Sequence, residues 1–204
     1  MEDPDLTAAD RAALLGLARR AIEAALAGRP APDLPNVPGA RLHRGAFVTL
    51  EEQGALRGCI GRIVGDRPLG EVIRSVAVSA ACDDPRFPAV APAELPALRI
   101  EISVLGEPVR REPMDLPGGQ GGGGREGFVI GRHGLVVRRA RAVGVLLPQV
   151  ATQQGLDPAG FLGAACRKAN LPPHSWREPG TEVFTFQADV FGETVAEGGG
   201  TADG

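Results

Sequence analysis

Apolar side chains repeat along the chain with two different periods, and this change predicts a fold of mixed helices and strands. They recur at helical spacing in three stretches, residues 8–27, 69–82 and 158–169. Residues 98–104 instead alternate apolar and polar positions with period two, which is typical of a strand with one buried face. Glu101 falls on the open face of that strand.

Local signals predict where the helices begin. Thr7 and Asp10 have the spacing of a capping box, with Asp in place of the usual Glu. Asp66 and Asp157 each precede a proline by one or two positions, which predicts an N-cap followed by proline in the first turn. Pro148 predicts the start of a further helix directly after a buried strand that begins at Val145.

Two β-hairpins are predicted. In the first, strands 46–50 and 55–60 flank the loop 51–54, whose length is typical of connections between antiparallel strands. The second follows the same outline: strand 127–130, connection 131–134 and strand 135–139. A last strand is predicted from Glu182 to Phe191.

Three stretches show neither the helical spacing nor the period-two alternation of a strand. Residues 29–40 are proline-rich and indicate an extended linker. Residues 106–124 indicate a glycine-rich loop, which lacks the Gly-Lys-Ser/Thr ending of a phosphate-binding loop. Residues 194–204 are rich in Gly, Glu and Ala, and we expect a disordered tail there.

Composition narrows the class of protein. The formal net charge of -3 argues against a nucleic-acid-binding protein, because such proteins need clustered cations facing phosphate. No apolar run has the length of a membrane span, and nothing resembles a signal peptide. The three cysteines are widely separated and form no CxxC pair, so neither a zinc knuckle nor a disulfide framework is expected. We therefore expect a cytoplasmic protein without a metal site.

The first hairpin ends in Leu56–Gly61, LRGCIG, which holds the residues most suggestive of chemistry. A thiol at Cys59, flanked by Gly58 and Gly61 where backbone can approach a ligand, is a candidate site. Arg57 lies two positions away and shares a face with Cys59 if the strand is regular. The alternative is structural, because free cysteine often acts as a small buried hydrophobe.

A second cluster lies in the loop after the helix that ends near residue 82. Asp83, Asp84 and Arg86 stand between Cys82 and Pro88. We interpret them as an ion-pair loop rather than a metal site, since two adjacent carboxylates rarely face one point. Cys82 and Cys166 lie on apolar helix faces and are interpreted as packing residues.

The LRGCIG motif and the loop 83–88 together resemble the AMMECR-one domain family, which includes AmmeMemoRadiSam system protein A. The resemblance continues in order along the chain through 101–105, 131–135, 146–150 and 161–169. It covers about residues 14 to 193. It implies an α+β fold in which a mixed or antiparallel sheet packs with helices in a larger domain, and a smaller α/β lobe accompanies it. Residues 1–193 would form this single two-lobed domain.

The resemblance also implies partners, because prokaryotic members look like companions of a Memo-like protein and a radical SAM protein. It names no cofactor and no reaction, and whether the protein is an enzyme stays open. The leading hypothesis is a cleft for a small anionic ligand around Arg57, Cys59, Arg86 and His133. The alternative is a non-catalytic adaptor that docks the two partners.

Candidate roles follow from residue chemistry. Cys59 and His133 would be a catalytic pair, with the histidine drawing the thiol proton. Arg57, Gly58, Gly61 and Arg86 would bind the ligand. Glu101 and Gln149 would line the cleft with polar groups. A last group could bind an anion or simply solvate a strand edge: Arg138, Arg139 and Arg141.

Overall fold

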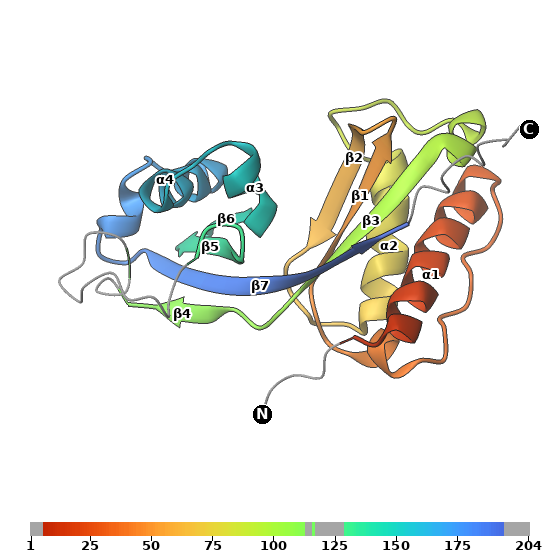
Figure 1. Ribbon diagram of the computed structural model, residues 1–204, viewed down its shortest axis with the longest axis horizontal. Coiled ribbons are helices and arrows are strands. Elements are labelled where there is room, and N and C mark those ends of the chain that lie inside the picture. The colour runs from red at the N-terminus through yellow and green to blue at the C-terminus, as the bar shows by residue number, and fades with distance from the viewer. Residues whose placement is uncertain (1–5, 113–115, 117–128, 194–204) are drawn as a thin grey trace, which may run out of the picture. The chain divides into compact units, whose positions relative to one another are not determined.

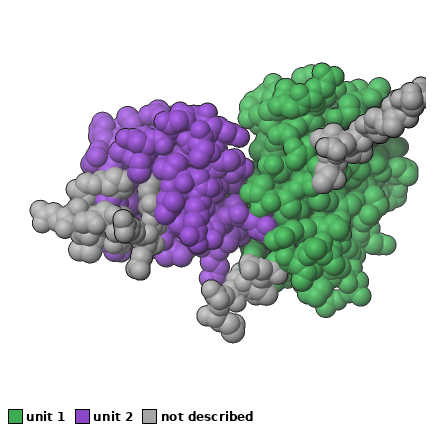
Figure 2. All heavy atoms as spheres, in the orientation of Figure 1, with its two compact units in different colours: residues 1–104, 190–204 green, residues 105–189 purple. Residues whose placement is uncertain are grey.

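The computed structural model describes residues 6–112, 116 and 129–193. The chain divides into two compact units, which are coloured separately in Figure 2. Unit 1 comprises Met1–Val104 with Val190–Gly204, and unit 2 comprises Leu105–Asp189. The glycine-rich segment 117–128 and the tail 194–204 lie outside the described residues.

Unit 1 is built on an antiparallel sheet with the strand order β2-β1-β3. Helix α2 lies directly against β1 and β2, and α1 packs beside α2 (Figure 1). Short 3-10 turns at Pro38–Arg41 and Pro92–Ala97 complete the unit. The bounds of its elements are α1 (Ala8–Leu26), β1 (Ala46–Glu52), β2 (Ala55–Arg62), α2 (Leu69–Cys82) and β3 (Leu98–Leu105).

The helix-facing side of this sheet forms the core of unit 1. Alternate residues of β1 and β3 point into it, as the period-two pattern requires. These side chains are almost fully buried together with the apolar faces of α1 and α2. The strand residues are Ala46, Val48 and Leu50 of β1 and Leu98, Ile100, Ile102 and Val104 of β3. The other set of alternating residues, which includes Glu101, therefore lies on the face away from the helices.

Two glycines of the LRGCIG motif are fixed by packing. A Cβ placed on Gly58 would lie 2.2 Å from the backbone carbonyl oxygen of Ala80, so β2 approaches α2 more closely than any side chain permits. A Cβ on Gly61 would lie 2.2 Å from the ring of Phe47, its partner across the two strands. Both glycines are explained by close approach within unit 1.

Unit 2 contains a second antiparallel arrangement of strands, in the order β4-β7-β5-β6. Helices α3 and α4 pack on β5 and β6, and buried Phe161, Leu162 and Cys166 of α4 form the core with strand residues. The bounds are β4 (Val109–Arg111), β5 (His133–Arg139), β6 (Ala142–Leu146), α3 (Pro148–Gln153), α4 (Pro158–Lys168) and β7 (Glu182–Gly192), with a 3-10 turn at Ser175–Arg177.

The helix start predicted at Pro148 is confirmed, and the predicted N-caps are confirmed at two of three positions. Thr7 accepts a hydrogen bond from the Asp10 N–H and closes the capping box, and Asp157 caps α4 by accepting from Gly160. The N-cap predicted at Asp66 is wrong. Its carboxylate forms an ion pair with Arg62 instead, and α2 begins at Leu69 without a side-chain cap.

The second hairpin was predicted with the wrong partner. Val129 and Ile130 are not part of a strand, and residues 127 and 128 lie outside the described range. β5 pairs instead with β6, through a turn in which Ala140 has a φ of 52°. The pattern at 127–130 resembles a strand, but these apolar residues precede a turn at Gly131, whose φ of 80° interrupts extended backbone. β4 also lies inside the predicted loop 106–124.

The fold class is α+β, as predicted, and the strand pairings described above are antiparallel. Among the described residues, no helix combines the length and apolar character needed to cross a bilayer.

Replacing Gly58 by Ala tests the close approach of β2 to α2. The new methyl group collides with the Ala80 carbonyl, which belongs to helix backbone and cannot rotate away. We expect Gly58→Ala to lower the free energy of unfolding by about 2 kcal/mol, as overpacking does. Urea unfolding measures the change.

The matched control is Leu56→Ala on the same strand, because Leu56 is exposed. We expect it to change the free energy of unfolding by less than about 0.5 kcal/mol. Equal unfolding midpoints for the two variants would show that the strand and helix can separate without cost.

Candidate functional site

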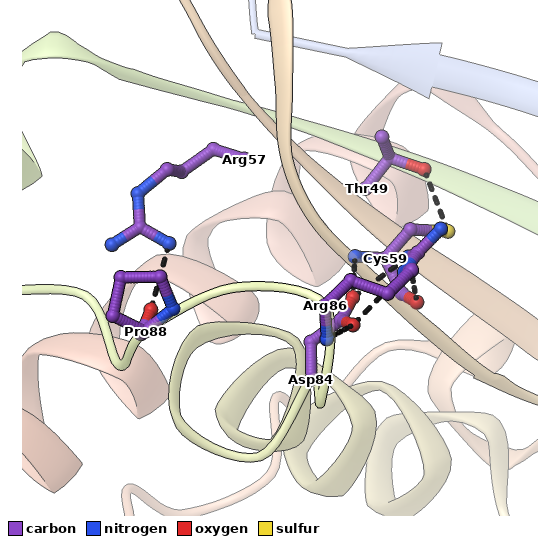
Figure 3. A network of polar contacts seen from close by, with 6 residues as sticks. All are labelled: Thr49, Arg57, Cys59, Asp84, Arg86 and Pro88. Carbon is purple, nitrogen blue, oxygen red and sulfur yellow. Dashed lines mark hydrogen bonds and ion pairs between the residues drawn. The ribbon is translucent and has the colours of Figure 1, made fainter.

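The backbone of Cys59 is held by side chains at the outer edge of the unit 1 sheet. β2 is the end strand in the order β2-β1-β3. The Cys59 N–H donates to Oδ2 of Asp84 at 2.8 Å, and Nη2 of Arg86 donates to the Cys59 carbonyl at 3.1 Å (Figure 3). A carboxylate and a guanidinium thus take the place of a neighbouring strand at this position.

Asp84 is the centre of this arrangement. The residue is only 4% exposed, and its carboxylate also accepts from the backbone N–H, Nε and Nη2 of Arg86 at 3.1, 3.0 and 2.7 Å. The Arg86 guanidinium holds the pKa of Asp84 well below its ordinary value, against the opposing effect of burial. The ion-pair interpretation of the loop 83–88 therefore agrees with its geometry for Asp84 and Arg86, while Asp83 is exposed.

The Cys59 side chain points to the open face of the sheet. Because its N–H and C=O are directed at the sheet edge, Cys59 and its partner Thr49 form a non-hydrogen-bonded pair, in which side chains lie close. The Thr49 hydroxyl donates to Sγ of Cys59 at 3.4 Å. Cys59 is a free thiol of intermediate exposure.

Thr49 also pairs with Glu101 of β3, so three polar side chains form one row across three strands. Glu101 is partly buried, and its pKa is raised by burial and then by the nearby charge of Glu51, while Arg99 opposes the shift. A carboxyl group with a raised pKa can hold or release a proton closer to neutral pH than an ordinary glutamate. We call Cys59, Thr49 and Glu101 the open-face row.

Arg57 does not belong to this row. The pairing of β1 with β2 shifts between Leu50 and Glu51, so Arg57 is the extra residue of a β-bulge. Its guanidinium contacts Glu94 at 2.7 Å and the Pro88 carbonyl at 2.9 Å, and it points away from the Cys59 thiol in Figure 3. The expectation that Arg57 and Cys59 share a face is wrong, because it assumed a regular strand.

The other two cysteines differ from Cys59. Cys82 is partly buried against the unit 1 core, and Cys166 is fully buried in unit 2. Burial raises the pKa of both thiols. Their interpretation as packing residues agrees with these positions.

His133 and Gln149 lie in unit 2. His133 is 8% exposed at the start of β5, and its Nδ1 accepts the Val129 N–H at 3.0 Å. Burial lowers its pKa, and the charges of Arg111 and Arg132 add to the effect. A neutral imidazole that accepts at Nδ1 carries its proton on Nε2, so Nε2 is a donor rather than a base.

Cys59 and His133 belong to different units, so their catalytic pairing stays a prediction. Gln149 lies on α3, partly buried, and its backbone carbonyl accepts the Thr152 hydroxyl at 2.9 Å. Its role as a cleft residue also stays a prediction.

The arginines near the end of β5 are engaged by carboxylates. Arg138 pairs with Glu182 at 2.8 Å, and Arg139 pairs with Glu178. Arg141 is exposed. The pairs are consistent with the simpler alternative, in which these arginines solvate a strand edge.

Two residues that contribute to the candidate site in unit 1 were not identified from the sequence. Thr49 gave no usable signal, because the predicted strands 46–50 and 55–60 place Ala46 opposite Cys59. The shorter turn and the bulge at Arg57 bring Thr49 opposite Cys59 instead. Glu94 gave no local signal, because it meets Arg57 only through the fold, across 37 positions of chain.

The architecture and the LRGCIG strand together define the class of protein. The chain belongs to the AMMECR1 family, whose sequence model matches residues 15–191. The resemblance noted from the sequence is thereby confirmed over almost the same range.

Relatives of similar length are found in archaea. A protein of Methanosarcina acetivorans is 41% identical over 202 residues, covering 95% of this chain and 96% of its own length. A protein of Methanothermobacter thermautotrophicus is 45% identical over 187 residues, covering 88% and 92%. The crystal structure of uncharacterized protein PH0010 from Pyrococcus horikoshii is similar with a TM-score of 0.79 and 40% identity, covering 88% of this chain and 89% of that one.

Asp84→Asn tests the contacts by which Asp84 and Arg86 hold the backbone of Cys59 at the edge of the sheet. The amide cannot form the ion pair with Arg86, so we expect the free energy of unfolding at pH 7 to fall by about 2 kcal/mol. The folded pKa of Asp84 lies below its ordinary value of 3.8, so its contribution is fully present above that pH and is lost as the pH falls further. Urea unfolding at pH 7 and at pH 3 should therefore show a smaller difference between variant and parent at the lower pH.

Asp83→Asn is the matched control, because it changes the adjacent, exposed carboxylate. We expect it to leave stability almost unchanged at both pH values. A pH-independent loss in Asp84→Asn, or an equal loss in Asp83→Asn, would contradict the ion-pair role.

Proposed function

We propose that unit 1 binds a small molecule on the open face of its sheet, and that the Cys59 thiol is the group that contacts or attacks it. The observation that carries this proposal is the open-face row. A free, partly exposed thiol lies on the face away from the helices, with a hydroxyl donor against its sulfur. Its backbone is fixed on both polar atoms, which gives the sulfur a defined position.

The row supplies complementary chemical groups. The Thr49 hydroxyl donates to the sulfur and would stabilise a thiolate there. Glu101, whose pKa is raised, would hold a proton for a developing negative charge on the ligand. Nucleophilic attack by a thiolate with an acid on the same face suits a polarised carbonyl compound.

The charges around the row favour a neutral ligand over the anion expected from the sequence. Arg57 and Arg86 were the expected cations, but Glu94 and Asp84 neutralise them within unit 1. Both guanidiniums hold the protein's own segments in place.

The protein would also act together with two partner proteins in the cell. By resemblance to AmmeMemoRadiSam system protein A, the protein would work in the cytosol beside a Memo-like protein and a radical SAM protein. Co-purification with these two proteins tests the association. Association that survives Cys59→Ser, with no ligand found for the row, would select the adaptor alternative.

Alkylation by iodoacetamide, followed for each cysteine by mass spectrometry, tests the accessibility and activation of Cys59. We expect Cys59 to react at least about tenfold faster than Cys166, since reaction needs an exposed thiolate. Thr49→Val removes the donor to the sulfur and should slow the reaction of Cys59. Thr152→Val, at an exposed threonine on α3, should not.

A small carbonyl compound that occupies the row should also protect Cys59 from alkylation. A panel of short aldehydes, ketones and thioesters provides the probes. A Cys59 that reacts as slowly as Cys166, and that no member of the panel protects, would rule out thiol chemistry at this row.

Glu101→Gln tests whether the charged Glu101 carboxylate of the open-face row lowers the stability of the folded protein. A carboxyl group whose folded pKa is raised binds its proton more tightly when folded, so stability falls as the pH rises above its ordinary value of 4.5. We expect Glu101→Gln to be more stable than the parent at pH 7 and equal to it near pH 4, as measured by thermal unfolding. Lower stability of the variant at pH 7 would show that the charged carboxylate has a stabilising partner.

A further inference from the structure

We propose that unit 2 holds a second binding site, which takes a compact organic anion: an apolar body with one carboxylate or phosphate head. The site is a pocket of about 270 Å³ between β4, the start of β7 and the turn at Ser175–Arg177. None of its residues belongs to the open-face row, so this proposal is independent of the function proposed for unit 1.

The inner wall of the pocket is apolar. Leu116 and Val183 are each 2% exposed, and Trp176 is 6% exposed. These side chains are almost fully covered and form the apolar floor of the pocket. Pockets for drug-sized ligands begin at roughly 300 Å³, so this volume suits a smaller molecule with a single ring or a short branched chain.

Two arginines at the pocket have no carboxylate partner among the described residues. Arg177 lies over the Trp176 ring, with its guanidinium carbon 3.9 Å from the ring centroid. Arg111 donates from Nε to the Thr185 hydroxyl at 2.7 Å, and its two Nη groups, which can also donate, face no carboxylate among the described residues. A guanidinium oriented by stacking or by one hydrogen bond is well prepared to bind an oxyanion through its remaining N–H groups.

The acidic residues of the lining do not cancel these two charges. Each of the three carboxylates already faces another arginine: Glu112 faces Arg110, Glu178 faces Arg139, and Glu182 faces both Arg138 and Arg110. Among the residues that the structure describes, five arginines therefore surround three glutamates, an excess of two positive charges. The pKa of Glu182 is lowered by Arg138 and Arg110, so it stays charged and continues to occupy them.

This distribution of charge explains why the ligand should be an anion with an apolar part. The oxyanion would bind between Arg111 and Arg177, and the apolar body would cover Leu116 and Val183. Arg138 and Arg139, which from the sequence could bind an anion or simply solvate a strand edge, would contribute indirectly here, because they neutralise the glutamates.

The full-length chain carries its own reporter for this pocket. Trp176 is the only tryptophan, and the chain contains no tyrosine, so intrinsic fluorescence reports on the pocket alone. We expect titration with benzoate or phenyl phosphate to change this fluorescence saturably. Calorimetry of the same titrations gives the affinity without relying on the emission of Trp176.

The variants Arg111→Gln and Arg177→Gln should each weaken binding about tenfold, the effect expected for losing one charge-assisted contact. Arg141→Gln, which removes an exposed arginine of the same unit outside the pocket lining, is the matched control and should bind as the parent does. Circular dichroism shows whether each variant is folded. Cys59→Ser should retain full binding, which separates this site from the one proposed in unit 1.

Inorganic phosphate alone tests the apolar part of the proposal and should bind much more weakly than phenyl phosphate. Equal affinity for the two would overturn the apolar site. Comparing benzoate with phenyl phosphate identifies the preferred head group. The proposal as a whole is overturned if neither compound gives a saturable signal at about 10 mM, well above a millimolar dissociation constant, or if both arginine variants bind like the parent.

Discussion

The carboxylate of Asp84 is the contact on which the candidate site of unit 1 depends. It is buried at the edge of the sheet, where it accepts from the Cys59 N–H and forms an ion pair with Arg86. Arg86 in turn donates to the Cys59 carbonyl. An edge strand normally leaves such groups unpaired and open to other chains. Here the pairing both closes the edge and directs the Cys59 side chain to the open face.

The residues of the LRGCIG motif can be divided into those with a structural role and those available for chemistry. Arg57 ties the bulge of β2 to Glu94, Gly58 permits the contact with α2, and Gly61 makes room for the Phe47 ring. Each of these three residues has a complete structural explanation. Only the thiol of Cys59 is left for chemistry, and the polar groups that act on it come from Thr49 of β1 and from Arg86 of the loop 83–88 rather than from the motif itself.

The two units use their charged residues differently. In unit 1 Arg57 and Arg86 are matched by carboxylates of the same unit, which leaves a free thiol and a carboxyl group of raised pKa on the open face. In the unit 2 pocket the three described carboxylates face other arginines, and Arg111 and Arg177 have no carboxylate partner among the described residues. The first arrangement suits a neutral, polarised ligand, and the second suits an organic anion.

The sequence by itself determined the family, the α+β class, the first hairpin, and the helix starts at Thr7 and Asp157. The hairpin and the helix starts could be predicted because they depend on local periodicity and on side chains that bond to backbone three residues away. The sequence also singled out Cys59 and Glu101. Tertiary structure alone decided the strand partner of β5 and the direction of Arg57, since a bulge of one residue reverses a face and leaves no mark in the pattern. It also decided which carboxylate meets each arginine, because such pairs join residues far apart in the chain.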